Sequence, residues 1–318
     1  MLELVFAAVL QSYAIDPDKI FVAGISSGGA MATQFHVAYS GTIKGAAIYA
    51  GVVDDCAQDD VMRALRNCGP MGYGKPLGAS EAFVDAQSAA GSIDPASDLQ
   101  GRPVYLWSGT RDHVVPQQAV DDLAAFYAHY GAVVTYDHTF SATHGWESPD
   151  GPNPCERFGT PYIIACERDG AVYDSEQTWL TLFFGPLKPR NDGTLSGTLT
   201  SFDQREFGRV EGLDATGWIF VPQSCAQGAR CGLVVAFDGC MMGEHEIGNT
   251  FARKAGINEW ADTNGIIVLY PYQSATDENP KDCWDWWGYT NDDYALKRGP
   301  QMAAIAKMVQ RLTGGKRP

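Results

Sequence analysis

Hydrophobic residues along this chain fall into short continuous runs that alternate with longer stretches of helical spacing. Short apolar runs bounded by turn residues are typical of buried strands, and apolar residues three or four positions apart are typical of helices that cover a sheet. Strands are predicted at 20–23, 45–49, 104–107, 133–140, 233–237 and 266–270. Helices are predicted over the first twenty residues as far as the Asp16-Pro17 turn, and at 30–39, 117–130, 177–184, 250–264 and 300–312. This alternation favours an α/β fold with a mainly parallel central sheet and helices on both faces.

Two regions depart from the alternation. Residues 193–202 and 217–222 alternate between apolar and polar positions with no helix between them, which predicts an antiparallel pair of strands. Residues 51–101 are rich in Gly, Pro, Ala and Asp and are predicted to form a loop region over a site or on the surface. No repeat or low-complexity linker divides the chain, so one domain is expected over 1–318, with a first part at 1–185 and a second at 190–318.

Charge and hydropathy narrow the range of partners. The 318 residues carry a formal net charge of −15, which disfavours binding to a nucleic acid because the phosphates would be repelled. No apolar run reaches the roughly 18 residues that a membrane span needs, and residues 4–10 lack the positive flank of an export signal. We therefore expect no membrane association and a neutral or cationic substrate.

The eight cysteines fall into local couples. The couples are Cys56 with Cys68, Cys155 with Cys166, Cys225 with Cys231, and the remaining Cys240 with Cys283. None has the C-x-x-C spacing of a zinc or thioredoxin-type site, so no metal is expected. Four sequential disulfides would indicate a secreted protein whose signal peptide is absent from this chain, although other pairings, or reduced thiols in a cytosolic enzyme, remain open.

A G-x-S-x-G pattern lies between a predicted strand and a predicted helix, at Gly24-Ile25-Ser26-Ser27-Gly28. In that context the serine occupies a strained turn that projects its hydroxyl from the edge of the sheet, and the glycines leave room for the close approach. The alternative is an ordinary Gly- and Ser-rich turn. The strand and the helix on either side favour Ser26 as a nucleophile.

A serine nucleophile needs a base and a carboxylate that orients the base. Asp112 follows the predicted strand at 104–107, and His144 follows the one that ends at Phe140. The order Ser, Asp, His is that of the α/β-hydrolases. Asp112 could instead serve as a local turn or cap residue. The other histidines are expected to be packed or solvated: His36, His113, His129, His138 and His245.

Acyl transfer also needs two donors to the oxyanion. One is expected from the amide of Ser27, directly after the nucleophile, and one from the loop that follows the strand at 233–237 and contains Cys240. In the usual α/β-hydrolase order that strand precedes the nucleophile, whereas here it follows the histidine. This order predicts a circular permutation.

Five segments carry a resemblance to a known family: YAIDP at 13–17, GISSGGAM at 24–31, VVAFDGC at 234–240, GIIVLYP at 265–271 and CWDW at 283–286. Together they resemble the extracellular poly(3-hydroxybutyrate) depolymerases and related esterases, and in particular their circularly permuted, single-domain fungal type. The resemblance implies a triad of Ser26, Asp112 and His144 and oxyanion donors at Ser27 and Cys240. It adds Trp286 as a residue that contacts substrate. The neighbouring Trp284 and Trp287 are further candidates, and the alternative for these two is ordinary packing in the core or at its rim. The chain departs from the family pattern at Asp238, where a histidine usually stands.

The function expected from this resemblance is that of a secreted serine esterase that cleaves a polyester or oligoester through an acyl-enzyme. No cofactor is expected, and the protein is expected to be a monomer. One alternative, with the same catalytic residues, is an esterase that acts on feruloyl or acetyl groups of plant polysaccharide. A second alternative is a protein that binds a polymer without catalysing any reaction.

The disulfide prediction can be checked by a free-thiol titration of the denatured protein without reductant. We expect no reactive thiols if all eight cysteines are paired as predicted. Eight reactive thiols would contradict both the pairing and the oxidising compartment that it indicates.

Overall fold

The architecture rests on an eight-stranded sheet in a computed structural model that describes residues 9–315. The strands lie in the order β12 (Thr198–Asp203), β13 (Thr216–Val221), β15 (Ile266–Tyr270), β14 (Cys231–Phe237), β1 (Ile15–Ile25), β2 (Ala46–Tyr49), β5 (Pro103–Trp107) and β6 (Val133–Asp137). Neighbours from β15 to β6 are parallel, whereas β13 is antiparallel to both β12 and β15. The predicted mainly parallel sheet is therefore confirmed, and so is the predicted antiparallel pair.

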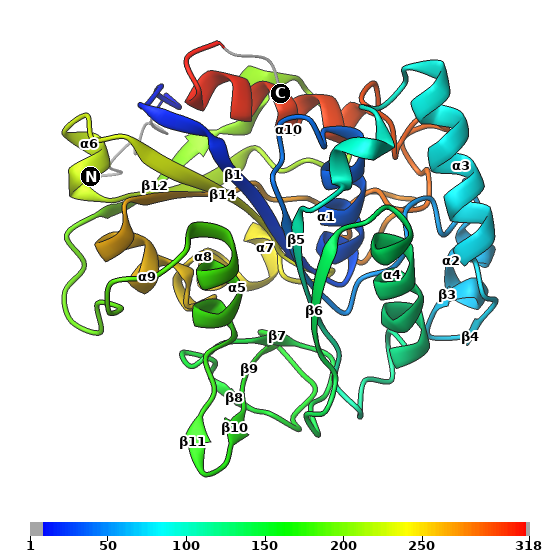
Figure 1. Ribbon diagram of the computed structural model, residues 1–318, viewed down its shortest axis with the longest axis horizontal. Helices are drawn as coiled ribbons and strands as arrows, with labels where there is room; N and C mark the ends of the chain where they lie inside the picture. The colour runs from blue at the N-terminus through cyan, green and yellow to red at the C-terminus, as the bar shows by residue number, and fades with distance from the viewer. Residues whose placement is uncertain (1–8, 316–318) are drawn as a thin grey trace.

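Helices cover both faces of this sheet, as predicted (Figure 1). Along β1, Ile20 and Val22 face one core, and Phe21 and Ala23 face the other, because successive side chains of a strand point to opposite faces. The first core is closed by α1 (Ser27–Ala38), α4 (Gln117–His129) and α10 (Pro300–Leu312). The second core is closed by α5 (Ser175–Phe184), α8 (Thr250–Lys254) and α9 (Ile257–Asn264).

The region predicted as loop contains two helices, α2 (Val61–Asn67) and α3 (Leu77–Ala90). The Asp60 side chain caps α2 by accepting a hydrogen bond of 2.6 Å from the Arg63 amide. Few apolar residues of these helices are buried, so their sequence carries little helical periodicity. The remaining short elements are α6 (Gln223–Ala226), α7 (Glu244–Ile247), β3 (Cys68–Gly69), β4 (Gly72–Tyr73), β7 (Trp146–Glu147), β8 (Asn153–Pro154), β9 (Ile163–Ala165), β10 (Glu167–Arg168), β11 (Ala171–Val172) and the 3-10 turns Ala96–Leu99 and Gln204–Phe207.

The predicted N-terminal helix is wrong for the residues that the structure describes. Strand β1 begins at Ile15, which pairs with Cys231 of β14, and residues 9–14 have no helical structure. The rest of that prediction, at 1–8, lies outside the described residues. Tyr13 instead donates its amide to the carbonyl of Leu312 at 2.8 Å. The first described segment thus lies against the end of α10, and pairing with distant segments overrides its amphipathic pattern.

The predicted helix at 250–264 is two helices, α8 and α9. The break is at Gly256, whose φ is 71°. A Cβ there would lie 2.6 Å from Oγ of Ser148, a buried residue. The chain therefore turns at the one residue type that tolerates both the dihedral angle and the contact.

The four predicted disulfides are present in the structure. The bonds are Cys56–Cys68, Cys155–Cys166, Cys225–Cys231 and Cys240–Cys283. The first three close short local loops, and the last joins residues 43 positions apart. Across residues 9–315, each helix is too short or too polar to cross a lipid bilayer.

Replacing Gly256 by alanine would introduce both a contact with Ser148 and a strained dihedral angle. A control variant with the strained angle alone separates the two costs. The control is Gly91→Ala, because Gly91 also has a φ of 71° but a Cβ there would meet nothing within 4 Å. We expect Gly91→Ala to lower the free energy of unfolding by about 1 kcal/mol, and Gly256→Ala to lower it by at least ~1 kcal/mol more, because buried groups must move. Urea unfolding measures both, and equal losses would contradict the expectation.

Candidate active site

Ser26 lies at the turn between the central strand β1 and helix α1. Its φ is 58°, in the left-handed region that residues with a side chain rarely adopt. The turn is held because its amide donates to the Tyr49 carbonyl and its carbonyl accepts from Ala30, both at 2.9 Å. A Cβ at Gly24 would lie 2.0 Å from the Gly28 carbonyl oxygen, so only glycine fits beside the turn. Such strain persists where the surrounding structure enforces it, as at functional sites.

His144 and Asp112 form a buried hydrogen-bonded pair. Nδ1 of His144 lies 2.7 Å from Oδ2 of Asp112, and the two side chains are 8% and 1% exposed. The other carboxylate oxygen of Asp112 accepts from the amides of Val114 and Val115 at 2.8 and 2.9 Å. Asp112 thus serves as a turn residue and also binds the histidine. This fixes the carboxylate, and with it the orientation of the imidazole.

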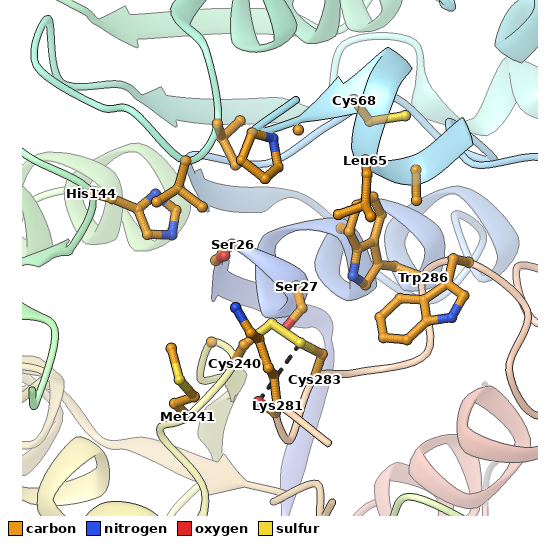
Figure 2. A pocket seen from close by; sticks show the side chains of 18 of the residues that line it. Ser26, Ser27, Leu65, Cys68, His144, Cys240, Met241, Lys281, Cys283 and Trp286 are labelled. Carbon is orange, nitrogen blue, oxygen red and sulfur yellow. Dashed lines mark hydrogen bonds between the residues drawn. A yellow bond between two sulfur atoms is a disulfide. The ribbon is translucent and has the colours of Figure 1, made fainter. Parts of the chain in front are cut away.

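Ser26 and His144 line the same pocket, which has a volume of about 630 Å³. Figure 2 shows His144 and Trp286 on opposite sides of it, with Ser26 between them. Most of the lining is apolar, and the charged residues in it are Glu278 and Lys281. Such a pocket suits an uncharged ligand that presents a polar group to the serine.

The other five histidines lie elsewhere. His36 is buried under the sheet with Nδ1 3.1 Å from the Tyr127 hydroxyl, and burial lowers its pKa to about 3. The other four are exposed. Of these, His129 and His245 face Glu81 and Asp214 at 3.7 and 3.3 Å.

The two backbone groups predicted as oxyanion donors lie near the Ser26 turn. Ser27 is the first residue of α1, where amides have no partner within the helix. Cys240 lines the pocket in the loop after β14. A Cβ on the preceding Gly239 would lie 3.3 Å from Cβ of Ser26, so this loop packs directly on the turn. Ser27 and Cys240 therefore both line the pocket beside the serine.

The Cys240–Cys283 disulfide joins this loop to the segment that carries the tryptophans (Figure 2). Buried Gln273 adds a second link, because its Nε2 donates to the carbonyls of Gly239 and Asp282 at 2.9 and 3.0 Å. The Met241 amide donates to the Lys281 carbonyl at 2.9 Å. Gln273 could not be predicted from the sequence, because a lone glutamine after a strand has no distinctive pattern.

The three tryptophans have different positions. Trp286 and Trp287 line the pocket, with ring centroids 5.7 Å apart. Trp284 does not line it, which corrects the expectation that it contacts substrate. Its ring is fully buried against Phe237 and its Nε1 donates to Asp238. Trp284 therefore supports the loop from beneath.

Part of the pocket comes from two segments in which no site residue was predicted. Val61 and Leu65 of α2 line one side, and Phe158 and Tyr162 contribute from the segment between β8 and β9. The described part of the chain holds no group of three His, Cys, Asp or Glu residues arranged to bind a metal ion.

Comparison with known proteins gives matches over nearly the whole chain. The family model "Esterase PHB depolymerase" matches residues 217–317, and "Prolyl oligopeptidase family" matches 2–151. A poly(3-hydroxybutyrate) depolymerase of Delftia acidovorans is 40% identical over 98% of this chain, and the chain spans 63% of that relative's length. A polyhydroxybutyrate depolymerase of Talaromyces funiculosus is 34% identical over 98% of this chain and 94% of its own.

The fold matches solved structures of the same kind. The crystal structure of PHB depolymerase from Penicillium funiculosum superimposes with a TM-score of 0.89 and 33% identity, and covers 97% of this chain and 99% of its own. A serine-to-alanine variant of PHB depolymerase complexed with an R3HB trimer gives the same values. Because both its sequence and its fold match these depolymerases over nearly the whole chain, the protein belongs to the poly(3-hydroxybutyrate) depolymerase family of α/β-hydrolases.

Proposed function

We propose that this protein is a secreted serine esterase that hydrolyses poly(3-hydroxybutyrate) or a related polyester. One observation carries the proposal: a serine in a strained turn and an aspartate-bound histidine line one apolar pocket. A neutral polyester suits a lining with few charged groups, and the strong negative charge of the chain does not repel it. The relatives named as depolymerases support the choice of substrate.

In the proposed mechanism, Ser26, His144 and Asp112 act together. Nε2 of His144 takes the proton of Ser26 as Oγ attacks the ester carbonyl, and Asp112 holds Nδ1–H and stabilises the imidazolium. The imidazolium then protonates the leaving alcohol, which gives an acyl-enzyme. Water, deprotonated by the same histidine, releases the acid and restores Ser26.

The amides of Ser27 and Cys240 are proposed to donate to the oxyanion of each tetrahedral intermediate. Backbone donors held in place before the reaction need no reorganisation as negative charge develops, which makes them effective. Trp286, on the side of the pocket away from His144 (Figure 2), and Trp287, which also lines the pocket, are proposed to contact the chain of the ester.

Two further features support secretion and a circular permutation of the chain. Four disulfides are typical of proteins of an oxidising compartment, which supports secretion. The described segments near the two ends are hydrogen-bonded at Tyr13 and Leu312, which is what a circular permutation requires. The position of the esterase family match at 217–317, after the serine, is consistent with that permutation.

Replacing Ser26 by alanine tests the function. We expect kcat on a 3-hydroxybutyrate trimer to fall by about six orders of magnitude, because the nucleophile is lost. The comparison variant is Ser27→Ala, which removes the neighbouring hydroxyl but keeps the proposed amide donor, and should lose far less. Hydrolysis that persists in Ser26→Ala would refute the role of Ser26.

The same assays distinguish the alternative esterase. We expect the wild-type protein to hydrolyse the 3-hydroxybutyrate trimer with a higher kcat/KM than methyl ferulate. The reverse preference would favour an esterase of plant polysaccharides, and no hydrolysis of either would favour a binding protein.

The Cys240–Cys283 bond is expected to affect activity as well as stability. Replacing both cysteines by serine should lower kcat on a soluble ester by about 10- to 100-fold, because small displacements of an oxyanion donor are costly. The control is the Cys225–Cys231 bond, which lies away from the pocket lining. Its double serine variant should lose stability and keep its kcat. Equal kcat in both variants would show that the bond beside the pocket does not position the loop.

A further inference from the structure

Among residues 9–315, Lys281 is the one lysine or arginine that lines the active-site pocket. Figure 2 shows its side chain extending from the segment of Cys283 into the pocket, toward the side on which Ser26 lies. The residue is exposed, and its ammonium group has no hydrogen bond or ion pair with the described part of the chain. An ammonium group offers three donors and no acceptor. A ligand in the pocket therefore meets an unpaired positive charge.

The backbone of Lys281 is fixed against the loop after β14. Its carbonyl accepts a hydrogen bond from the Met241 amide at 2.9 Å. Buried Asn279 closes the turn around it, because Nδ2 donates to the Cys283 carbonyl at 2.7 Å and Oδ1 accepts from the Cys283 amide at 3.0 Å. The Cys240–Cys283 bond adds a covalent link. These contacts keep the ammonium group at the pocket although the side chain itself is long and flexible.

The other charged residue of the lining, Glu278, does not neutralise Lys281. It is exposed, and the two side chains form no ion pair with each other or with any other residue between 9 and 315. An anion in the pocket would be repelled by Glu278, so it would bind where it contacts the ammonium group directly. The rest of the lining is mostly apolar and excludes water, which strengthens a contact between opposite charges.

A linear oligomer of 3-hydroxybutyrate carries one such anion. Its ester groups are neutral, but one end is a carboxylic acid, which is ionised at neutral pH. Each hydrolysis of an ester also leaves a new carboxylate end on one of the two products. The pocket, of about 630 Å³, has the volume of sites that take ligands larger than one repeat unit. When an ester close to the acid end lies at Ser26, the carboxylate therefore lies in the same pocket.

We propose that Lys281 binds the terminal carboxylate of a linear oligoester, so that the enzyme prefers short chains with a free acid end to neutral chains. This inference rests on the proposed esterase function and specifies its substrate. The chain's net charge of −15 repels anionic oligomers at long range, and Lys281 offsets that repulsion where the substrate binds. The soluble oligomers released from a polyester are then substrates as well as products.

The test compares the 3-hydroxybutyrate trimer with its primary amide, in which a neutral group of the same shape replaces the terminal carboxylate. We expect the wild type to hydrolyse the free acid with a kcat/KM about tenfold higher than that of the amide, because a charge-assisted hydrogen bond is lost in the amide. In Lys281→Met, which keeps the apolar stem without the charge, the ratio should fall to about one. Lys281→Arg keeps the charge and should keep most of the preference.

The control for net charge is Lys19→Met. Lys19 is exposed on the first half of β1 and lies outside the pocket lining, so its loss changes the net charge equally and should leave the ratio as in the wild type. An unchanged ratio in Lys281→Met would overturn the proposal. An equal fall in kcat/KM on both trimers would also overturn it, because the ammonium group would then act at the reacting carbonyl and not at the chain end.

Calorimetry separates this inference from the proposed function. In Ser26→Ala, which should not cleave the trimer, the free acid should bind with a Kd about tenfold lower than that of the amide. Adding Lys281→Met should remove the difference. If the wild type hydrolysed neither trimer, the proposed function would fail while the two Kd values would still decide the role of Lys281. Equal affinity for the two trimers, or binding of neither, would overturn that role.

Discussion

The close contact between the turn after β1 and the loop after β14 is the constraint on which the rest of the site depends. A Cβ at Gly28 would lie 2.1 Å from the carbonyl oxygen of Asp238, so the two segments meet through backbone alone. The parallel pairing of β1 with β14 brings them together, since Gly24 is in register with Phe237. The positions of Ser26, Ser27 and Cys240 follow from that pairing, and a side chain at Gly28 would separate them.

Buried acids also tie the segment that follows His144 to the rest of the fold. Beyond His144, Glu147 accepts the Ser175 amide at 3.1 Å through one oxygen, and burial raises its pKa to about 8. Nearby Glu176 accepts from Nε1 of Trp146 at 3.0 Å. The residues that follow His144 are thus tied to α5 by buried hydrogen bonds. Because burial raises the pKa of Glu147 from its usual 4.5 to about 8, the stability that this group contributes falls as the pH rises between those two values, and the loss is complete above a pH of about 8.

Much of the fold could be predicted from the sequence because its central strands are continuous apolar runs between turn residues. The candidate triad could be predicted as well, since Ser26, Asp112 and His144 each follow such a strand. The predictions that were wrong concern residues whose structure depends on distant contacts. The N-terminal segment has a helical pattern, but its Ile15 pairs with Cys231 in a strand. Trp284 is of a residue type that often contacts substrate, but it is buried beneath the loop. Helix α2 was missed because its exposed face carries apolar residues such as Val61, which obscures the usual alternation.

The place of β1 in the sheet has a consequence for how the chain folds during its synthesis. One neighbour, β2, follows β1 closely in the sequence, but the other, β14, begins only at Cys231. Until that strand leaves the ribosome, the edge of β1 that it will cover stays open, and open apolar edges pair readily with other chains. The pairing of β1 with β14 therefore forms only after the roughly 200 residues between them have been synthesised, and such long-range contacts slow folding.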